Sequence, residues 1–178
     1  MIEVDKGEYF VSKTIRDRLV KNGVRFFAND NIADYIDHNN NELDLLVDEL
    51  AVKFKDVLSS LVIDVENDPN SMDTGRRLAK MYVHELMEGR YSKEPKATSF
   101  PNEGPERFEG MLCVRAELTS MCSHHHQPVR GIAIIGIIPT GRVIGLSKYV
   151  RIAQWCARRG QLQEDLVNQI SKAIMQKL

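Results

Sequence analysis

Residues 111–138 read MLCVRAELTSMCSHHHQPVRGIAIIGII, and this stretch decides the fold. In its first ten residues apolar side chains alternate with polar ones, which predicts a strand with one buried face. The alternating apolar positions are Leu112, Val114, Ala116 and Leu118. The run 129–138 is apolar on both faces and predicts a second strand. Because the turn SMCSHHHQP joins the two strands, we predict an antiparallel hairpin with this turn at its tip.

The predicted hairpin is too apolar to stand alone. Two strands do not form a stable sheet by themselves, and isoleucines on both faces would leave a large apolar surface in water. We therefore expect the hairpin to continue a sheet that other subunits supply.

Helical spacing appears before and after the hairpin. Apolar residues three and four apart from Glu42 to about residue 64 predict one amphipathic helix. Thr74 is expected to be the N-cap of a second helix that stops at Gly89. The expected buried stripe of that helix is Leu78, Met81, Tyr82 and Leu86. Residues 1–40 show weak patterning, so we expect an arm or an irregular lead-in.

Two further helices are predicted after the hairpin. Ser147 is the expected N-cap of the first, and Gly160 is its expected end. Apolar residues of the two helices are Tyr149, Ile152, Ala153, Cys156, Leu162, Leu166, Ile170, Ala173, Ile174 and Leu178. The fold class is therefore α+β. We expect an N-terminal arm and helices over 1–92, a proline-rich loop over 93–110 and a β-β-α-α domain over 111–178.

Composition limits the kind of protein. The 178 residues are 43% hydrophobic and 28% charged, with a net charge of −1, which describes a folded chain without global attraction to nucleic acid or anionic membranes. No apolar run approaches a membrane span, and the first residues lack a signal-peptide core. The three cysteines are irregularly spaced, which is typical of a reducing compartment. We expect a cytoplasmic protein that contacts neither membrane nor nucleic acid.

The hairpin turn concentrates metal-binding side chains. Cys122, His124 and His125 offer the sulfur and nitrogen donors that Zn²⁺ prefers, and a tight turn can direct two of them to one ion. Metal binding is the more specific interpretation of this turn. A surface turn that happens to be rich in histidine remains the alternative.

Two weaker patterns follow the hairpin. Ser147, Lys148 and Arg151 lie in the first turns of a predicted helix, where free backbone N–H groups, a hydroxyl and two cations would suit a phosphate. An ordinary helix start with solvated basic residues explains them equally well. Gln163 and Glu164 begin the last helix, where an acidic residue commonly does no more than complement the helix dipole.

These patterns together resemble GTP cyclohydrolase I. The segment TGRRLAKMYVHEL (74–86) is similar to that family's TP-x-R-x-A-K-M-Y helix, and VRAELTSMCSHHH (114–126) to its strand ending in C-E-H-H. The segment VIGLSKYVRIAQWCARRGQLQEDLVNQI (143–170) is similar to its VIGLSK-x-x-R-I-x-x-x-x-A-x-R-x-Q-x-Q-E-x-L pattern. The matches keep the family's order and spacing over more than half of the chain.

The resemblance implies a zinc enzyme. It implies zinc ligands at Cys122 and His125 and a catalytic histidine at His124. The implied reaction opens the imidazole ring of GTP at C8, releases formate and forms 7,8-dihydroneopterin triphosphate. Zinc would supply hydroxide near neutral pH, and His124 would move protons to the leaving ring nitrogen. The product could feed pterin, tetrahydrofolate or 7-deazaguanine synthesis.

The resemblance also implies contacts with GTP and an assembly. The matched substrate positions are Arg77, Ser147, Lys148, Arg151, Gln163 and Glu164. The first would reach the phosphates from a neighbouring subunit, the next three would bind the triphosphate, and the last two would read the guanine edge. The implied fold is half of a tunnelling fold, whose sheet is completed in a homo-oligomeric ring such as a decamer.

The sequence departs from the family at the site. Ser123 stands where the family has glutamate, and His126 where it has phenylalanine or a similar residue. We expect the chain to lack the two further strands that carry the family's third zinc ligand. That ligand would then come from His126, from Cys113, from a second chain that supplies these strands, or from nowhere.

Two alternatives to this enzyme remain open. One is a non-catalytic subunit, complete by itself or completed by a partner, that binds a purine or pterin. The other is a related enzyme with a different purine or pterin substrate.

Overall fold

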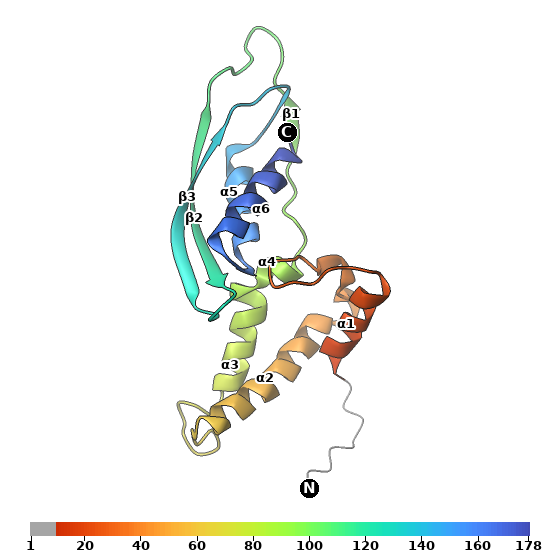
Figure 1. The fold of residues 1–178 in the computed structure, drawn as a ribbon, viewed down its shortest axis with the longest axis vertical. Helices are drawn as coiled ribbons and strands as arrows, with labels where there is room; N and C mark the ends of the chain where they lie inside the picture. The colour runs from red at the N-terminus through yellow and green to blue at the C-terminus, as the bar shows by residue number, and fades with distance from the viewer. Residues whose placement is uncertain (1–9) are drawn as a thin grey trace. The chain divides into compact units, whose positions relative to one another are not determined.

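The computed structural model describes residues 10–178, which form two compact units (Figure 1). The first, called the helical unit, holds the described residues up to Arg25 together with Asp34–Val83. The second, called the hairpin unit, holds Phe26–Ala33 and His84–Leu178. The mixture of helices and small sheets confirms the predicted α+β class. The predicted boundary at 93–110 stays a prediction, which limited proteolysis of that loop would test.

The helical unit is built from α1 (Val11–Lys21), α2 (Glu42–Ser60) and α3 (Thr74–Met81). The short 3₁₀ turns Ala33–Tyr35 and His38–Asn40 precede α2. The predicted helix from Glu42 is confirmed, although it ends at Ser60 rather than near residue 64. The expected irregular lead-in is wrong for Val11–Lys21. Its buried residues Val11, Ile15 and Leu19 are spaced by four, which is a helical period within a polar sequence.

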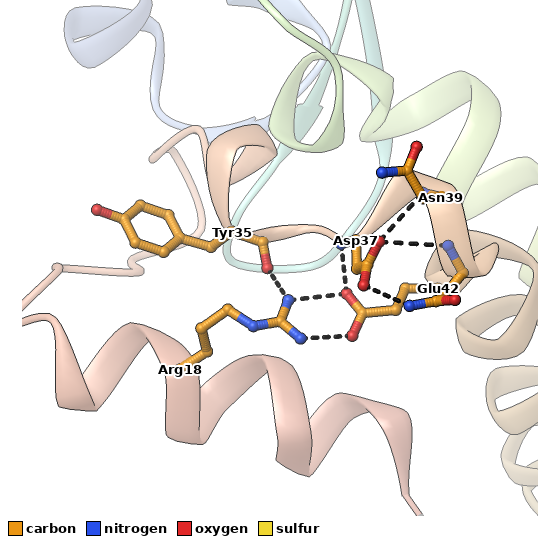
Figure 2. Close-up of polar contacts among 6 residues, drawn as sticks. Arg18, Tyr35, Asp37, Asn39 and Glu42 are labelled. Carbon is orange, nitrogen blue, oxygen red and sulfur yellow. Dashed lines mark hydrogen bonds and ion pairs between the residues drawn. The ribbon is translucent and has the colours of Figure 1, made fainter.

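An ion pair between the half-buried Arg18 and the buried Glu42 joins α1 to the start of α2 (Figure 2). Arg18 donates to both carboxylate oxygens of Glu42, at 2.9 and 2.6 Å, and to the carbonyl oxygen of Tyr35. Glu42 also accepts a hydrogen bond from the backbone N–H of Asp37 at 2.6 Å. The hydrogen bonds from Arg18 are the largest cause that lowers the pKa of Glu42, because they stabilise its charged form. The network fixes where α2 begins.

The helix predicted from Thr74 to Gly89 is divided. Asp73, not Thr74, is the N-cap of α3, which passes into a π-helical turn at Tyr82–Leu86 and then into α4 (Glu88–Tyr91). Gly89 therefore lies inside α4 and does not stop a helix. The fully buried positions are Gly75, Ala79 and Val83, and the predicted stripe is only half-buried. Gly75 explains the shift, because a Cβ there would lie 2.7 Å from the carbonyl oxygen of Ala51 on α2.

The predicted hairpin is confirmed. Strand β2 (Leu112–Cys122) pairs antiparallel with β3 (Pro128–Ile137), in a register that places Leu112 opposite Ile137 and Met121 opposite Pro128. The short strand β5 (Gly160–Gln161) adds in parallel to the end of β2, giving the order β3-β2-β5. A separate ribbon pairs β1 (Ser99–Pro101) with β4 (Arg142–Ile144).

Two helices cover the inner face of the hairpin: α5 (Leu146–Ala157) and α6 (Gln163–Met175). The core between these helices and β2 contains Val114, Ala116, Leu118, Tyr149, Ile152, Ala153, Cys156, Ile170 and Ile174. Gly145, and not Ser147, is the N-cap of α5. Gly160 lies in β5, three residues beyond the end of α5, so it does not end that helix.

The other face of the hairpin carries exposed isoleucines. Ile132, Ile134 and Ile138 are 56%, 65% and 70% exposed. The outer edge of β3 has no strand beside it within residues 10–178. Apolar surface and an open strand edge therefore occur together, as the sequence predicted for a sheet that continues into another chain. No helix within the described part of the chain is long and apolar enough to cross a membrane.

Candidate substrate and metal site

The tip of the hairpin holds the predicted metal ligands. Cys122 is the last residue of β2 and is half-buried, on the side of the strand that faces the helices. Its backbone N–H donates to the carbonyl oxygen of Gln127 at 3.0 Å, and its own carbonyl oxygen accepts from the N–H of His126 at 2.9 Å. His126 adopts a left-handed conformation with φ of 53°, which lets the chain reverse within this short turn. Backbone hydrogen bonds therefore fix the base of the turn.

His124 and His125 are both exposed. Their ring centroids lie 6.3 Å apart and their planes are 81° from parallel. Two imidazoles at this separation and angle can bind different groups. A thiol and an imidazole on one turn fit zinc by their donor chemistry. Among residues 10–178, no three histidine, cysteine or acidic side chains gather closely enough to hold one ion.

Cys113 cannot complete this donor set within the same chain. It lies nine positions before Cys122 in the same strand, which corresponds to about 30 Å. An odd number of positions also places the two cysteines on opposite faces of the sheet. Cys156 is buried in the core, and burial raises the pKa of its thiol to about 11. Of the predicted third ligands, His126 and a residue of another chain remain.

A cavity of about 420 Å³ lies between the hairpin and the first half of α6. Its polar lining residues include Ser120 and Cys122 from β2, Gln161 from β5 and Gln163 from α6. Apolar residues of β3 and α6 form most of the remaining wall. The structure therefore brings Cys122 and Gln163 to one cavity, although they are 41 positions apart in sequence. Glu164 follows Gln163 in the exposed first turn of α6.

The predicted phosphate residues lie at the start of α5. Ser147 and Arg151 are exposed and four positions apart, so they share a helix face, and Lys148 is half-buried beside them. The first turn of a helix presents backbone N–H groups that have no partner within the helix. Arg151 also lines a small cavity of about 200 Å³ with Lys93, Trp155 and Arg158. Cations and helix N–H groups together can bind an anion.

The tip of the hairpin and the start of α5 lie at different ends of the hairpin unit (Figure 1). α5 has 12 residues and is therefore about 18 Å long. Its C-terminal end leads directly into β5, which pairs with Cys122, whereas Ser147 and Lys148 lie at its other end. One chain does not bring the two predicted groups together.

Arg77 lies on α3 in the helical unit. It is exposed, and its guanidinium is 3.6 Å from the carboxylate of Asp73 and 3.4 Å from the carbonyl oxygen of Asn70. Both are surface contacts of the kind that contributes little to stability, so an incoming anion could replace them.

Sequence reasoning missed Gln161. This residue is 4% exposed, lines the same cavity as Cys122, and stands directly opposite Cys122 in the β5–β2 ladder. One available signal was its match to the first glutamine of the family's R-x-Q-x-Q-E pattern. Another was its position between two helices, because a polar residue in a short extended link must find a hydrogen-bond partner if the link is buried.

Comparison with known proteins identifies the family of the chain. A sequence model described as GTP cyclohydrolase I matches residues 50–178. GTP cyclohydrolase 1 of Aeromonas salmonicida is 42% identical over 120 residues, which cover 66% of this chain and 54% of the relative. GTP cyclohydrolase 1 of Buchnera aphidicola is 39% identical over 141 residues, which cover 78% of this chain and 62% of the relative. The chain thus spans little more than half the length of the relatives it matches. It belongs to the GTP cyclohydrolase I family.

Proposed function

We propose that this chain is a subunit of a zinc-dependent GTP cyclohydrolase I. The reaction hydrolyses the imidazole ring of GTP at C8, releases formate and leads to 7,8-dihydroneopterin triphosphate. The observation that carries the proposal is the shared cavity of Cys122 and Gln163 in a member of this family. A largely apolar cavity with a few convergent polar groups is the usual form of a site for a flat heterocycle.

Cys122 and His125 are the proposed zinc ligands. A thiolate and an imidazole suit Zn²⁺, and the backbone hydrogen bonds of the turn hold the thiol in place. Bound zinc supplies Lewis acidity that makes water a nucleophile near neutral pH. The third protein ligand is His126 or a residue from another chain. A catalytic zinc site commonly has three protein ligands.

The remaining residues bind and orient the nucleotide. Glu164 accepts hydrogen bonds from the N1–H and 2-amino edge of guanine, and Gln163 helps to orient the ring from the cavity wall. His124, whose ring is turned 81° from that of His125, accepts and returns a proton at the ring nitrogen that leaves C8. Lys148, Ser147 and Arg151 neutralise the triphosphate.

We propose that each site is shared between subunits. The base-binding end and the phosphate-binding end lie at opposite ends of α5, so one nucleotide would contact the first end of one subunit and the second end of its neighbour. Arg77 would come from a neighbouring helical unit. The open edge of β3 and its exposed isoleucines support assembly into a ring, in which strands of other subunits or of a second chain extend the sheet.

The experiment is metal analysis of the purified chain together with release of formate from GTP labelled at C8. We expect close to one zinc per subunit and labelled formate that depends on that zinc. Absence of formate from a zinc-loaded, oligomeric sample would contradict the proposed reaction.

A binding subunit without catalysis is the second candidate. It is favoured by the hairpin turn, where the two assigned ligands are not joined by a third metal-binding side chain within residues 10–178. Zinc and guanosine binding without formate, even after addition of a chain that carries the further strands, would select this candidate.

A further inference from the structure

Gln161 anchors its side chain on the last turn of α5. Its Nε2 atom donates to the carbonyl oxygen of Cys156 at 2.6 Å and to that of Ala157 at 3.4 Å. Carbonyl groups in the last turn of a helix receive no hydrogen bond from an N–H group of the same helix. When such a carbonyl is buried, it therefore needs a donor from elsewhere. Because both neighbours are acceptors, only the nitrogen of the amide can face them, and this fixes the orientation of the side chain.

The backbone of the same residue holds the end of β2. Gln161 stands opposite Cys122 in the parallel β5–β2 pairing, and Gly160 stands opposite Met121. Two positions later, Gln163 begins α6 and lines the cavity. One buried residue therefore connects the C-terminal turn of α5, the strand end that carries Cys122 and the start of the helix that carries Gln163.

We infer that Gln161 is a positioning residue, which sets Cys122 and Gln163 in register with each other by tying both to α5. The inference rests on the proposed function for the roles of these two residues, but not for the contacts themselves. Although Gln161 lines the cavity, this role requires no hydrogen bond from its side chain to the substrate or the metal, because its amide nitrogen is bound to α5. Its effect passes through the backbone of β5.

The Oε1 atom of the Gln161 amide can be kept while the Nε2 atom is replaced. The Oε1 atom of Gln161 is buried and has no hydrogen-bond partner within the described part of the chain. Gln161→Glu keeps the shape of the side chain, but it replaces the donor with an oxygen and adds a negative charge that would face two carbonyl oxygens.

Gln169 provides a matched control. Its Nε2 donates to the carbonyl oxygen of Asn29 at 3.3 Å, and its Oε1 accepts from Arg159 at 3.0 Å. It lies on α6 in the same unit but does not line the cavity. Gln169→Leu should therefore cost stability, as Gln161→Leu does, without changing the positions of Cys122 and Gln163.

The test compares Gln161→Leu, Gln161→Glu and Gln169→Leu with the wild type. The first readout is the rate of alkylation of Cys122 without metal, followed by peptide mass spectrometry. The second is the zinc concentration that half-protects Cys122, and the third is the affinity for guanosine. We expect alkylation to rise about tenfold in Gln161→Leu, because the strand end loses its anchor. We expect half-protection to need roughly 10- to 100-fold more zinc.

Gln161→Glu should raise the rate of alkylation as Gln161→Leu does, because it also lacks the donor to α5. Gln169→Leu should leave all three readouts within about twofold of the wild type. Equal changes in Gln161→Leu and Gln169→Leu, or none in either, would overturn the inference. If zinc fails to protect Cys122 in the wild type, the proposed metal site fails, and the alkylation rates still decide the role of Gln161.

Discussion

The two ends of the hairpin unit differ in the chemistry they offer. At the hairpin tip, Cys122 and His125 provide soft metal donors beside a mostly apolar cavity. At the start of α5, Lys148 and Arg151 provide positive charge beside backbone N–H groups. A nucleotide needs both kinds of surface, one for its base and one for its phosphates. About 18 Å of helix separates the two ends, and this difference supports the proposal that one chain supplies two half-sites rather than one whole site.

The largest effect should follow from changing the ligands at the hairpin tip. Cys122→Ala and His125→Ala should each remove zinc and abolish formate release, with the thiolate the more severe loss because it also removes charge neutralisation. His124→Ala should keep zinc and slow turnover by about 10² to 10⁴, as expected for a lost proton-transfer group. Metal analysis and formate assays check both. Loss of zinc in His124→Ala but not in His125→Ala would reverse the assignment.

The next effect concerns the phosphate end. Lys148→Ala should weaken GTP binding by roughly 10- to 100-fold, because a charge-assisted hydrogen bond to phosphate is lost. Guanosine binding, zinc content and the unfolding midpoint should change little. Calorimetric titration with the two ligands measures the difference. A parallel loss of guanosine affinity would show that the two ends do not divide base and phosphate between them.

A smaller effect tests whether the helical unit is independent of the hairpin tip. Glu42→Gln breaks the pair with Arg18 and should lower the free energy of unfolding by about 2 kcal/mol at neutral pH. The folded pKa of Glu42 is lowered, so its contribution is present above the unfolded value of about 4.3 and is lost as the pH falls below it. Denaturant unfolding of both proteins should therefore converge in acid, and zinc protection of Cys122 should not change. A stability difference that persists in acid would show that the ion pair is not its source.

The smallest expected effect concerns a residue of α5 that lies between the hairpin tip and the start of this helix. Tyr149 is completely buried in α5, and its hydroxyl has no hydrogen-bond partner within residues 10–178. Tyr149→Phe removes an unsatisfied polar group and should raise the free energy of unfolding by about 0.5–1 kcal/mol, with guanosine and zinc binding unchanged. A clear loss of stability would indicate that the hydroxyl has a partner in the assembled protein.

The sequence predicted those features that depend on local patterns. Strict alternation over residues 112–118 required a strand, and the turn at residues 120–128 required a hairpin. Helix ends were less predictable. Serine is the better N-cap by preference, yet Gly145 takes that position because β4 ends directly before it at Ile144. α1 was missed because its polar residues conceal a buried face of only three side chains.

Motif order could not reveal the distances between site residues. Cys113 and Cys122 look alike in a list of possible ligands, but strand geometry places them about 30 Å apart on opposite faces. Ser147 and Gln163 belong to one continuous motif, yet α5 carries them to opposite ends of the unit. Gln161 matches a glutamine of the family pattern, but its place opposite Cys122 became visible only in the β5–β2 pairing. Pairing between segments distant in sequence is the information that a single sequence lacks.

Subunit complementation tests the shared site most directly. Cys122→Ala assemblies are expected to be inactive, and Lys148→Ala assemblies nearly so when GTP is kept far below the concentration that half-saturates the wild type, because this variant loses affinity for GTP. If they are dissociated, mixed in equal amounts and reassembled, about a quarter of the sites should combine an intact hairpin tip from one subunit with an intact α5 start from another. We predict that formate release returns to about a quarter of the wild-type rate in the mixture. No recovery in assemblies shown to contain both variants would contradict the account, because each site would then lie within a single chain.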